Sequence, residues 1–276
     1  MGGLARQQGL WSPGPGRWIY AAYRRIADAL GPRTVRIAGG PLAGKTLGAR
    51  WSLRRSPYAG GDYEPAVADA LDALARSGSV AFDVGAHFGY FTLLLARRAA
   101  HVYAFEPAPA NFRALRRTLA DNHIDNASAY PLAVAASDGD DVLAITAASS
   151  MCRLHGNTRA IPRAGEGVVQ RARVETVRLD SFVQHARVPR VDLVKLDVEG
   201  HELHALLGMQ GVVRRWQPAL VIEVHRELAG GEDPRHVLHL LDRWGYVCRD
   251  LDVGGRPITS LAHTWSEHHI LAERGA

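Results

Sequence analysis

The sequence predicts an α/β protein with a doubly wound, mostly parallel sheet. Short apolar strands alternate with amphipathic helices along most of the chain. A buried strand at 80–84 leads through two glycines, Gly85 and Gly89, into a helix. The next strand, 102–106, ends in a lone acid, Glu106, about 20 positions further on. Together these three observations predict a nucleotide site at the carboxyl ends of the strands.

The elements follow in chain order. Residues 17–30 carry apolar positions at helical spacing among arginines, so we expect a basic amphipathic helix that packs on the domain or covers its cleft. Residues 33–48 predict a short hairpin. We expect an N-terminal extension, 1–60, ahead of one domain, 61–276. The domain's expected helices lie at 64–76, 88–98, 110–122, from about 202, and 235–244, and its later strands at 129–136, 191–197, 220–225, 246–252 and 269–272.

The alternation of strands and helices breaks between 140 and 178. Two β-type segments there flank a stretch, 149–167, that is rich in glycine, proline and arginine. Long irregular segments inside a compact domain are often functional loops. We therefore expect an inserted β-hairpin with a mobile loop that selects the substrate.

Composition excludes several classes of function. The 276 residues are 47% hydrophobic and 22% charged, as in an ordinary globular protein. The net charge of +5 comes almost entirely from arginine, without a basic patch interleaved with aromatics, so no nucleic-acid partner is predicted. No apolar run reaches the roughly 18 residues of a membrane span, and no signal peptide is visible. With Cys152 and Cys248 expected as free thiols, these features predict a cytoplasmic protein.

The spacing of the glycine turn narrows the choice of nucleotide that the site could bind. Dinucleotide sites carry G-x-G-x-x-G and phosphate-binding loops G-x-x-x-x-G-K-S/T, whereas this turn is D-x-G-x-x-x-G and begins at Asp83. A carboxylate there repels a pyrophosphate and suits the ammonium of S-adenosylmethionine, while the glycines allow backbone to approach the ligand. A dehydrogenase of the same fold is thereby disfavoured. The simpler alternative is a strand–turn–helix in which Asp83 only caps the helix.

Two strands carry ionisable residues where a covered parallel sheet is normally apolar. Lys195 and Asp197 share one face of the first strand, Glu223 and His225 share one face of the next, and His201 follows in the turn. Ligands of open α/β sheets bind at these strand ends. The alternative for Lys195 and Asp197 is a structural ion pair. A binding module without catalysis would not need so many ionisable groups here.

Several segments together resemble the FkbM family of S-adenosylmethionine-dependent methyltransferases, over about residues 60–250. They are Asp83-Val-Gly-Ala-His-Phe-Gly-Tyr-Phe, Phe105-Glu-Pro, Leu179-Asp-Ser-Phe, Val194-Lys-Leu-Asp-Val-Glu-Gly-His-Glu202 and Ile222-Glu-Val-His225. The resemblance implies the class I methyltransferase (Rossmann-like) fold. It also implies methylation of a hydroxyl oxygen on a sugar, polyketide or other secondary metabolite, so the expected partner is a small-molecule hydroxyl acceptor.

The resemblance also implies roles for individual residues. Asp83, Gly85 and Gly89 are expected to cradle the methionyl part, Glu106 to hold the ribose, and Ser137 and Asp138 to lie beside the adenine. His87 stands where the family usually has Asn and is expected to bond the cofactor's tail. The full expected cofactor set is Tyr63, Glu64, Asp83, Gly85, His87, Gly89, Glu106, Ser137, Asp138 and Lys195.

Methyl transfer to a hydroxyl requires alignment, and a base that removes the proton accelerates it. The expected catalytic residues are His201, His225, Asp197 and Glu223, with one of the histidines as the base. The alternative is a metal-assisted reaction, in which Asp197, Glu223 and His225 hold Mg²⁺ or Mn²⁺ as a Lewis acid. The imidazole argues against magnesium, so no metal is the favoured prediction.

Overall fold

The computed structural model describes residues 33–49, 56–146, 152–154, 168–225, 233–258 and 267–275. The predicted helix at 17–30 and the loop segment 155–167 lie outside the described residues. Strands β1 (Arg33–Arg36) and β2 (Thr46–Ala49) pair antiparallel, which is the hairpin expected for 33–48. Among the described residues, no helix is long and apolar enough to cross a membrane.

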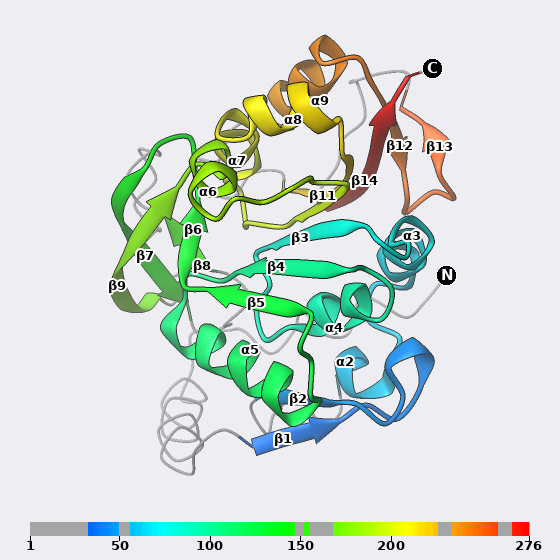
Figure 1. The fold of residues 1–276 in the computed structure, drawn as a ribbon, viewed down its shortest axis with the longest axis vertical. Coiled ribbons are helices and arrows are strands. Elements are labelled where there is room, and N and C mark those ends of the chain that lie inside the picture. Colours follow the sequence, from blue (N-terminus) through cyan, green and yellow to red (C-terminus); the bar gives the residue numbers. More distant parts are fainter. Residues whose placement is uncertain are drawn as a thin grey trace, which may run out of the picture.

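An eight-stranded sheet forms the centre of the protein, in the order β13-β12-β14-β11-β10-β3-β4-β5 (Figure 1). Its five strands from β11 to β5 run parallel, and β14, β12 and β13 extend it antiparallel. The predicted mostly parallel α/β fold is confirmed. The strands are β3 (Val80–Val84), β4 (His101–Phe105), β5 (Ala127–Tyr130), β10 (Leu193–Leu196), β11 (Ala219–His225), β12 (Tyr246–Asp250), β13 (Arg256–Pro257) and β14 (Glu267–Arg274).

Helices cover both faces of this sheet, because both faces of its central strands are apolar. In β3, Phe82 packs into the core on one face and Ala81 into the core on the other. The first face carries α6 (Leu179–His185), α7 (Glu202–Leu207), α8 (Gln210–Trp216) and α9 (Pro234–Arg243). The other carries α3 (Pro65–Leu74), α4 (Tyr90–Ala96), α5 (Pro109–Asp121), the hairpin, and the short η2 (Gly40–Leu42) and α2 (Pro57–Gly60).

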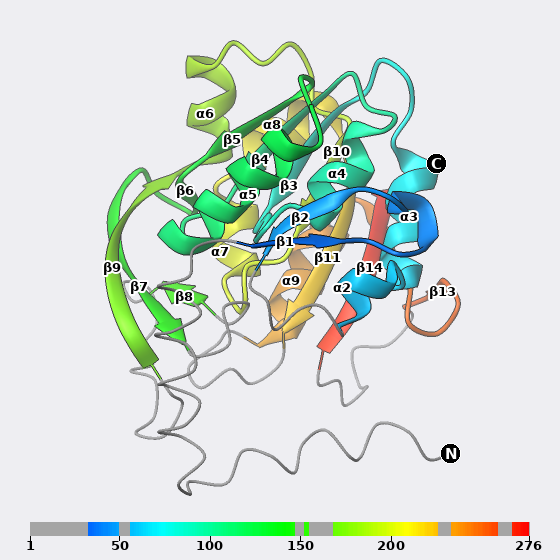
Figure 2. The same ribbon diagram turned by 90° about the horizontal axis from the view of Figure 1, so that it is seen from below.

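The single strand predicted for 129–136 is wrong, because the chain changes sheets at Pro131. Proline has no backbone N–H to donate to a ladder, and β5 ends at Tyr130. The chain continues as β6 (Leu132–Val134), which belongs to a second sheet of order β6-β9-β7-β8. In that sheet β7 (Gly139–Thr146) and β9 (Val168–Val177) pair antiparallel, with β8 (Cys152–Leu154) beside β7. Figure 2 shows this sheet flanking the main one.

Candidate active site

A cavity of about 420 Å³ lies at the carboxyl ends of the parallel strands. The turn after β3, residues 85–88, forms part of its wall, and Glu106 enters from the end of β4. Asp197, Glu199 and His201 follow β10, and Glu223 and His225 end β11. The volume falls in the range of small-molecule sites. The topology thus brings together the residues that the sequence placed at separate strand ends.

The cavity receives only part of the predicted cofactor set. Six of its residues line the wall: Tyr63, Glu64, Gly85, His87, Glu106 and Lys195. Asp83, Gly89, Ser137 and Asp138 are not among the described residues that line it.

Glu106 is fixed at the cavity by backbone donors. The His87 N–H donates to its Oε2 at 2.9 Å, and the Ala108 N–H donates to its Oε1 at 2.8 Å. Burial raises the pKa of Glu106 to about 7, although these hydrogen bonds act in the opposite direction. The Asn111 amide also donates to Oε1 at 3.4 Å, so it is Oε2 that keeps a second lone pair with which to accept from a ligand hydroxyl.

Both turn glycines have a positive φ and leave no room for a Cβ. Gly85 has φ +80°, and a Cβ there would lie 1.7 Å from the carbonyl oxygen of Asp197. Gly89 has φ +92°, and its Cβ would lie 2.7 Å from Leu115. Protein atoms therefore occupy the position of a Cβ at both glycines. The approach of a ligand to the turn backbone stays a prediction, with Gly85 at the cavity wall. The glycines allow the left-handed turn and the close packing of neighbouring elements.

Asp83, expected to cradle the methionyl part of the cofactor, is not among the described residues that line the cavity. It is fully buried; Thr92 of α4 donates to its Oδ2 at 2.5 Å, and Lys195 Nζ lies 3.9 Å from its Oδ1. Lys195 also donates to Asp197 Oδ2 at 3.1 Å. Burial alone would lower the pKa of Lys195, but the carboxylates of Asp197 and Asp83 outweigh it and raise that pKa. The interaction between Lys195 and Asp197 is thus a buried ion pair at the edge of the site.

The structure gives Asp138 a structural contact instead of one to the cavity. Its Oδ1 accepts from the Arg178 backbone N–H at 2.7 Å, and its Oδ2 accepts from the Ser181 hydroxyl at 2.6 Å. These bonds hold the start of α6. Ser137 uses its carbonyl to accept from Thr176 at 3.0 Å. The apolar wall of the cavity comes instead from earlier residues of this segment, including Leu132 and Val134.

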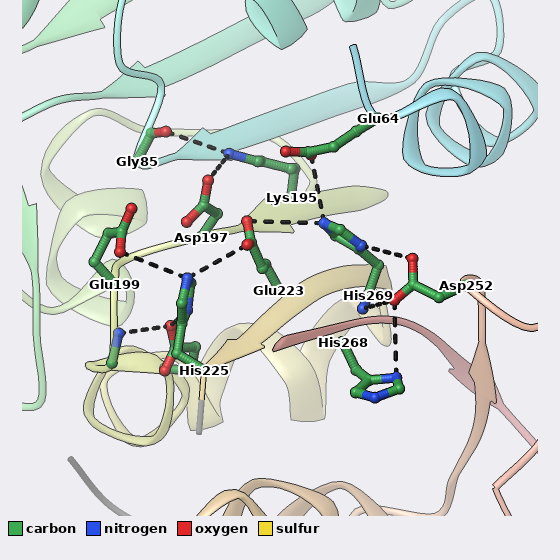
Figure 3. Close-up of polar contacts among 12 residues, drawn as sticks. Glu64, Gly85, Lys195, Asp197, Glu199, Glu223, His225, Asp252, His268 and His269 are labelled. Atoms are coloured by element: carbon green, nitrogen blue, oxygen red, sulfur yellow. Dashed lines mark hydrogen bonds and ion pairs between the residues drawn. The ribbon is translucent and has the colours of Figure 1, made fainter. Parts of the chain in front are cut away.

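His225 is surrounded by carboxylates (Figure 3). Its Nδ1 donates to Glu202 Oε1 at 2.8 Å, and its Nε2 lies 3.4 Å from Glu223 and 3.6 Å from Glu199. Burial would lower the pKa of His225, but Glu202 and Glu223 outweigh it and raise the pKa to about 12. This arrangement does not suit the expected role of His225 as a base, because a histidine must be neutral to accept a proton.

Because His225 already carries its proton, the carboxylates around it are the better candidates for the base. Glu199, in the turn after β10, has a φ of +55°. Burial raises the pKa of Glu199 to about 8, and the charge of Asp197 adds to the rise. Burial also raises the pKa of Glu223. His201, the other expected base, lines the cavity at the start of α7 but is only 4% exposed.

Sequence reasoning missed a second imidazole at this site. His269 of β14 is the direct cross-strand partner of Glu223. Its Nδ1 lies 2.9 Å from Asp252, and its Nε2 lies 3.5 Å from Glu64 and 3.9 Å from Glu223 (Figure 3). The only signal was the closing strand expected at 269–272, which does not by itself fix the register.

Tyr58 was also missed, although Tyr63 was expected at the entry. The two rings stack with centroids 3.8 Å apart, and both line the cavity. Phe88 and Tyr90 pack edge-on against Tyr58, at 4.7 and 5.7 Å. This aromatic wall stands on the same side of the cavity as Glu64, one residue beyond Tyr63.

Two groups of side chains at the cavity could hold a metal ion. One is the predicted set, Asp197, Glu223 and His225; the other is Glu64, Glu223 and His269. In each group the potential ligand atoms lie within 4.8 Å of one another. Glu223 belongs to both groups.

The chain matches known proteins across this site. A family model described as "Methyltransferase FkbM domain" matches residues 83–248, more than half of the chain. The hexuronic acid methyltransferase AglP of Haloferax volcanii is 29% identical over 167 residues, which cover 60% of this chain and 63% of AglP. The 31-O-demethyl-FK506 methyltransferase FkbM of Streptomyces tacrolimicus is 29% identical over 177 residues, covering 54% of this chain and 66% of that protein. The matches therefore span less than two thirds of these relatives.

Solved structures are similar at lower identity. The methyltransferase FkbM of Methylobacillus flagellatus superimposes with a TM-score of 0.44 and 17% identity, over 70% of this chain and 43% of that chain. The putative methyltransferase SMU.1697c of Streptococcus mutans, in complex with SAH, has a TM-score of 0.45 and 13% identity, over 75% and 94%.

Proposed function

Because this chain belongs to the FkbM methyltransferase family, we propose that it transfers the methyl group of S-adenosylmethionine to a hydroxyl oxygen of a sugar or other natural product. The observation that carries this proposal is the convergence of Glu106 and the Glu199–Glu223–His225 cluster on one cavity. Glu106 is placed to bind the ribose of a nucleoside, and the cluster is placed to bind and deprotonate a hydroxyl.

The residues present suit the cofactor. Oε2 of Glu106 can accept from a ribose hydroxyl, and Leu132 and Val134 offer an apolar surface for an adenine ring. The carboxylates at the strand ends suit a ligand that carries a sulfonium and an ammonium. When bound, the cofactor supplies an electrophilic methyl group. The chain must then align the acceptor hydroxyl with this methyl group and accept the proton that the hydroxyl releases.

We assign the proton-accepting role to Glu199. It lines the cavity, and its raised pKa, about 8, matches a base that works near neutral pH. His225 is then a positioning residue: Glu202 fixes its Nδ1, and its Nε2 holds the Glu199 and Glu223 carboxylates in place. Burial would raise the pKa of Asp197, but Lys195 outweighs burial and lowers that pKa. Asp197 therefore stays ionised and adds negative charge near the site, and the base role goes to Glu199.

The relatives support the acceptor class. The printed names of two of them give a hexuronic acid and 31-O-demethyl-FK506 as what they methylate. The stacked Tyr58 and Tyr63 provide a flat apolar wall, and the neighbouring carboxylates accept hydrogen bonds from hydroxyls. A polyhydroxylated ring fits both features.

Calorimetry with S-adenosylmethionine and with NAD tests the proposal first. We expect the protein to bind the former and not the latter; the reverse result would favour a dehydrogenase. Incubation with methyl-labelled cofactor and a panel of neutral sugars, uronic acids and macrolides should then give a product heavier by one labelled methyl group. A chain that binds neither nucleotide contradicts the proposed function.

A further inference from the structure

We propose that Glu64, Glu223 and His269 bind one divalent first-row transition-metal ion beside the cavity. This set replaces the one predicted from the sequence, and it includes a histidine that the proposed mechanism does not use. The binding of the ion does not depend on the proposed function. Only the chemical role of the ion does.

Three elements bring the ligand atoms together. Glu223 of β11 and His269 of β14 are direct partners in the antiparallel ladder, so their side chains leave the same face of the sheet. Glu64 approaches from the residue before α3, where its φ is +42°. The Nε2 atom of His269 lies 3.5 Å from Glu64 Oε2 and 3.9 Å from Glu223 Oε2. Ligands bound at about 2.0–2.2 Å to one ion require separations of this size.

His269 is oriented as metal-binding histidines usually are. Asp252 accepts from the His269 backbone N–H at 2.9 Å with one oxygen and contacts Nδ1 at 2.9 Å with the other. An ionised carboxylate only accepts hydrogen bonds, so the Nδ1 atom carries the proton and Nε2 faces Glu64 and Glu223. A carboxylate on the far nitrogen is the recurrent second contact of a histidine that ligates a metal.

The charges also favour this set over Asp197, Glu223 and His225. The Lys195 ammonium donates to Asp197 at 3.1 Å and would repel a cation there. The hydrogen bonds and ion pairs described for that ammonium are with Asp83, Asp197 and the Gly85 carbonyl, whereas Glu64 acts on it only through a coulombic interaction. A +2 ion would balance these two carboxylates with His269 neutral. Without an ion, a proton on His269 balances part of the negative charge of Glu64 and Glu223.

The donor set indicates the kind of ion. Two carboxylates and one imidazole suit Mn²⁺ or Zn²⁺ better than Mg²⁺, which prefers oxygen ligands. Three protein ligands leave coordination positions open towards the cavity, which Glu64 and Glu223 line. If the proposed function holds, such an ion would lower the pKa of an acceptor hydroxyl.

Titration of the full chain with Mn²⁺ after removal of metals by EDTA tests the site. Electron paramagnetic resonance detects the Mn²⁺ that stays free in solution, and the difference from the total should give one bound Mn²⁺ per chain. Zn²⁺ should displace this bound Mn²⁺. Glu64→Gln and His269→Gln should weaken binding at least tenfold, and Asp252→Asn should weaken it about 10–100-fold through loss of the second contact. His236→Gln, at an exposed histidine of α9, is the control and should bind like the wild type. Circular dichroism checks that each variant is folded.

Two results would overturn the site: absence of stoichiometric Mn²⁺ or Zn²⁺ binding by the wild type, or wild-type binding by folded His269→Gln. Loss of the ion in Asp197→Asn with retention in His269→Gln would also overturn it, in favour of the other set. Calorimetry with S-adenosylmethionine, run in parallel, separates the two proposals. A chain that binds Mn²⁺ here but not the cofactor contradicts the proposed function and leaves the ion site standing.

Discussion

Glu202 accepts a hydrogen bond of 2.8 Å from Nδ1 of His225, 23 residues further along the chain. Both side chains are almost fully buried, and the same Glu202 oxygen accepts from the Gly200 backbone N–H at 2.9 Å. Glu202 therefore ties the turn after β10 to the end of β11. Because Glu199 lies in that turn, the bond also sets the position of the proposed base.

We expect Glu202→Gln to destabilise the fold and slow turnover while leaving cofactor affinity within twofold. The neutral amide keeps the shape but loses a charged hydrogen bond, which is worth about 1.5–3 kcal/mol. Urea denaturation should show a loss of this size. Glu175→Gln, at an exposed acid of β9, serves as the control and should change the free energy of unfolding by less than about 0.5 kcal/mol. Equal stability of the two variants would contradict this account of the bond.

The affinity for S-adenosylmethionine should rise with pH through about 7. Burial raises the pKa of Glu106 to about 7, and ribose hydroxyls bind best to its ionised form. The cofactor therefore competes with a proton below that pH, and the dependence levels off above it. Calorimetry between pH 5.5 and 8.5 measures this.

Glu106→Gln supplies the control for this pH dependence. Its affinity at pH 8 should fall at least tenfold, since a charged hydrogen bond is worth about 1.5–3 kcal/mol, and its pH profile should be flat. A variant that keeps the wild-type slope would show that another group titrates.

Gly85→Ala and Gly78→Ala form a matched pair, because the two glycines have almost the same φ, +80° and +85°. At Gly78 no atom lies within 4 Å of an added Cβ, so only the backbone strain of about 1–2 kcal/mol applies. At Gly85 the Cβ would lie 1.7 Å from the Asp197 carbonyl oxygen, which adds a cost of about 1–3 kcal/mol for overpacking. Thermal unfolding should show a smaller loss of stability for Gly78→Ala than for Gly85→Ala. Equal losses would mean that β10 moves away without penalty.

The alternation of apolar strands and helices was enough to predict the parallel sheet, because each strand is buried on both faces and its neighbours repeat the pattern. The strand predicted through Pro131 failed because a continuous apolar run outweighed the missing N–H. The glycine turn was located correctly, but the protein contacts beside its glycines were not predicted. Sequence spacing does not show that the Asp197 carbonyl occupies the space beside Gly85.

At the site, the sequence could not predict the contacts that join distant segments of the chain. That Glu223 and His225 share a strand end follows from local spacing. The approach of Glu64 to His269, 205 positions later, depends on the register between β11 and β14. Likewise, His225 looked like a base in sequence because nothing local, apart from Glu223 two residues earlier, reveals the carboxylates of Glu202 and Glu199 around it.

The base assignment gives the last prediction. Glu199→Gln should lower kcat by about 10²–10⁴-fold, the usual contribution of a positioned base, and leave affinity for S-adenosylmethionine unchanged. In the wild type, kcat/KM should rise with pH through about 8, because only the ionised carboxyl accepts a proton and burial raises the pKa of Glu199 to that value. The residual activity of the variant should lack this rise. Methyl transfer to an acceptor identified in the panel measures both, with Glu175→Gln as the control. Wild-type turnover in Glu199→Gln would mean that alignment alone drives the reaction, and that Glu199 only holds the acceptor.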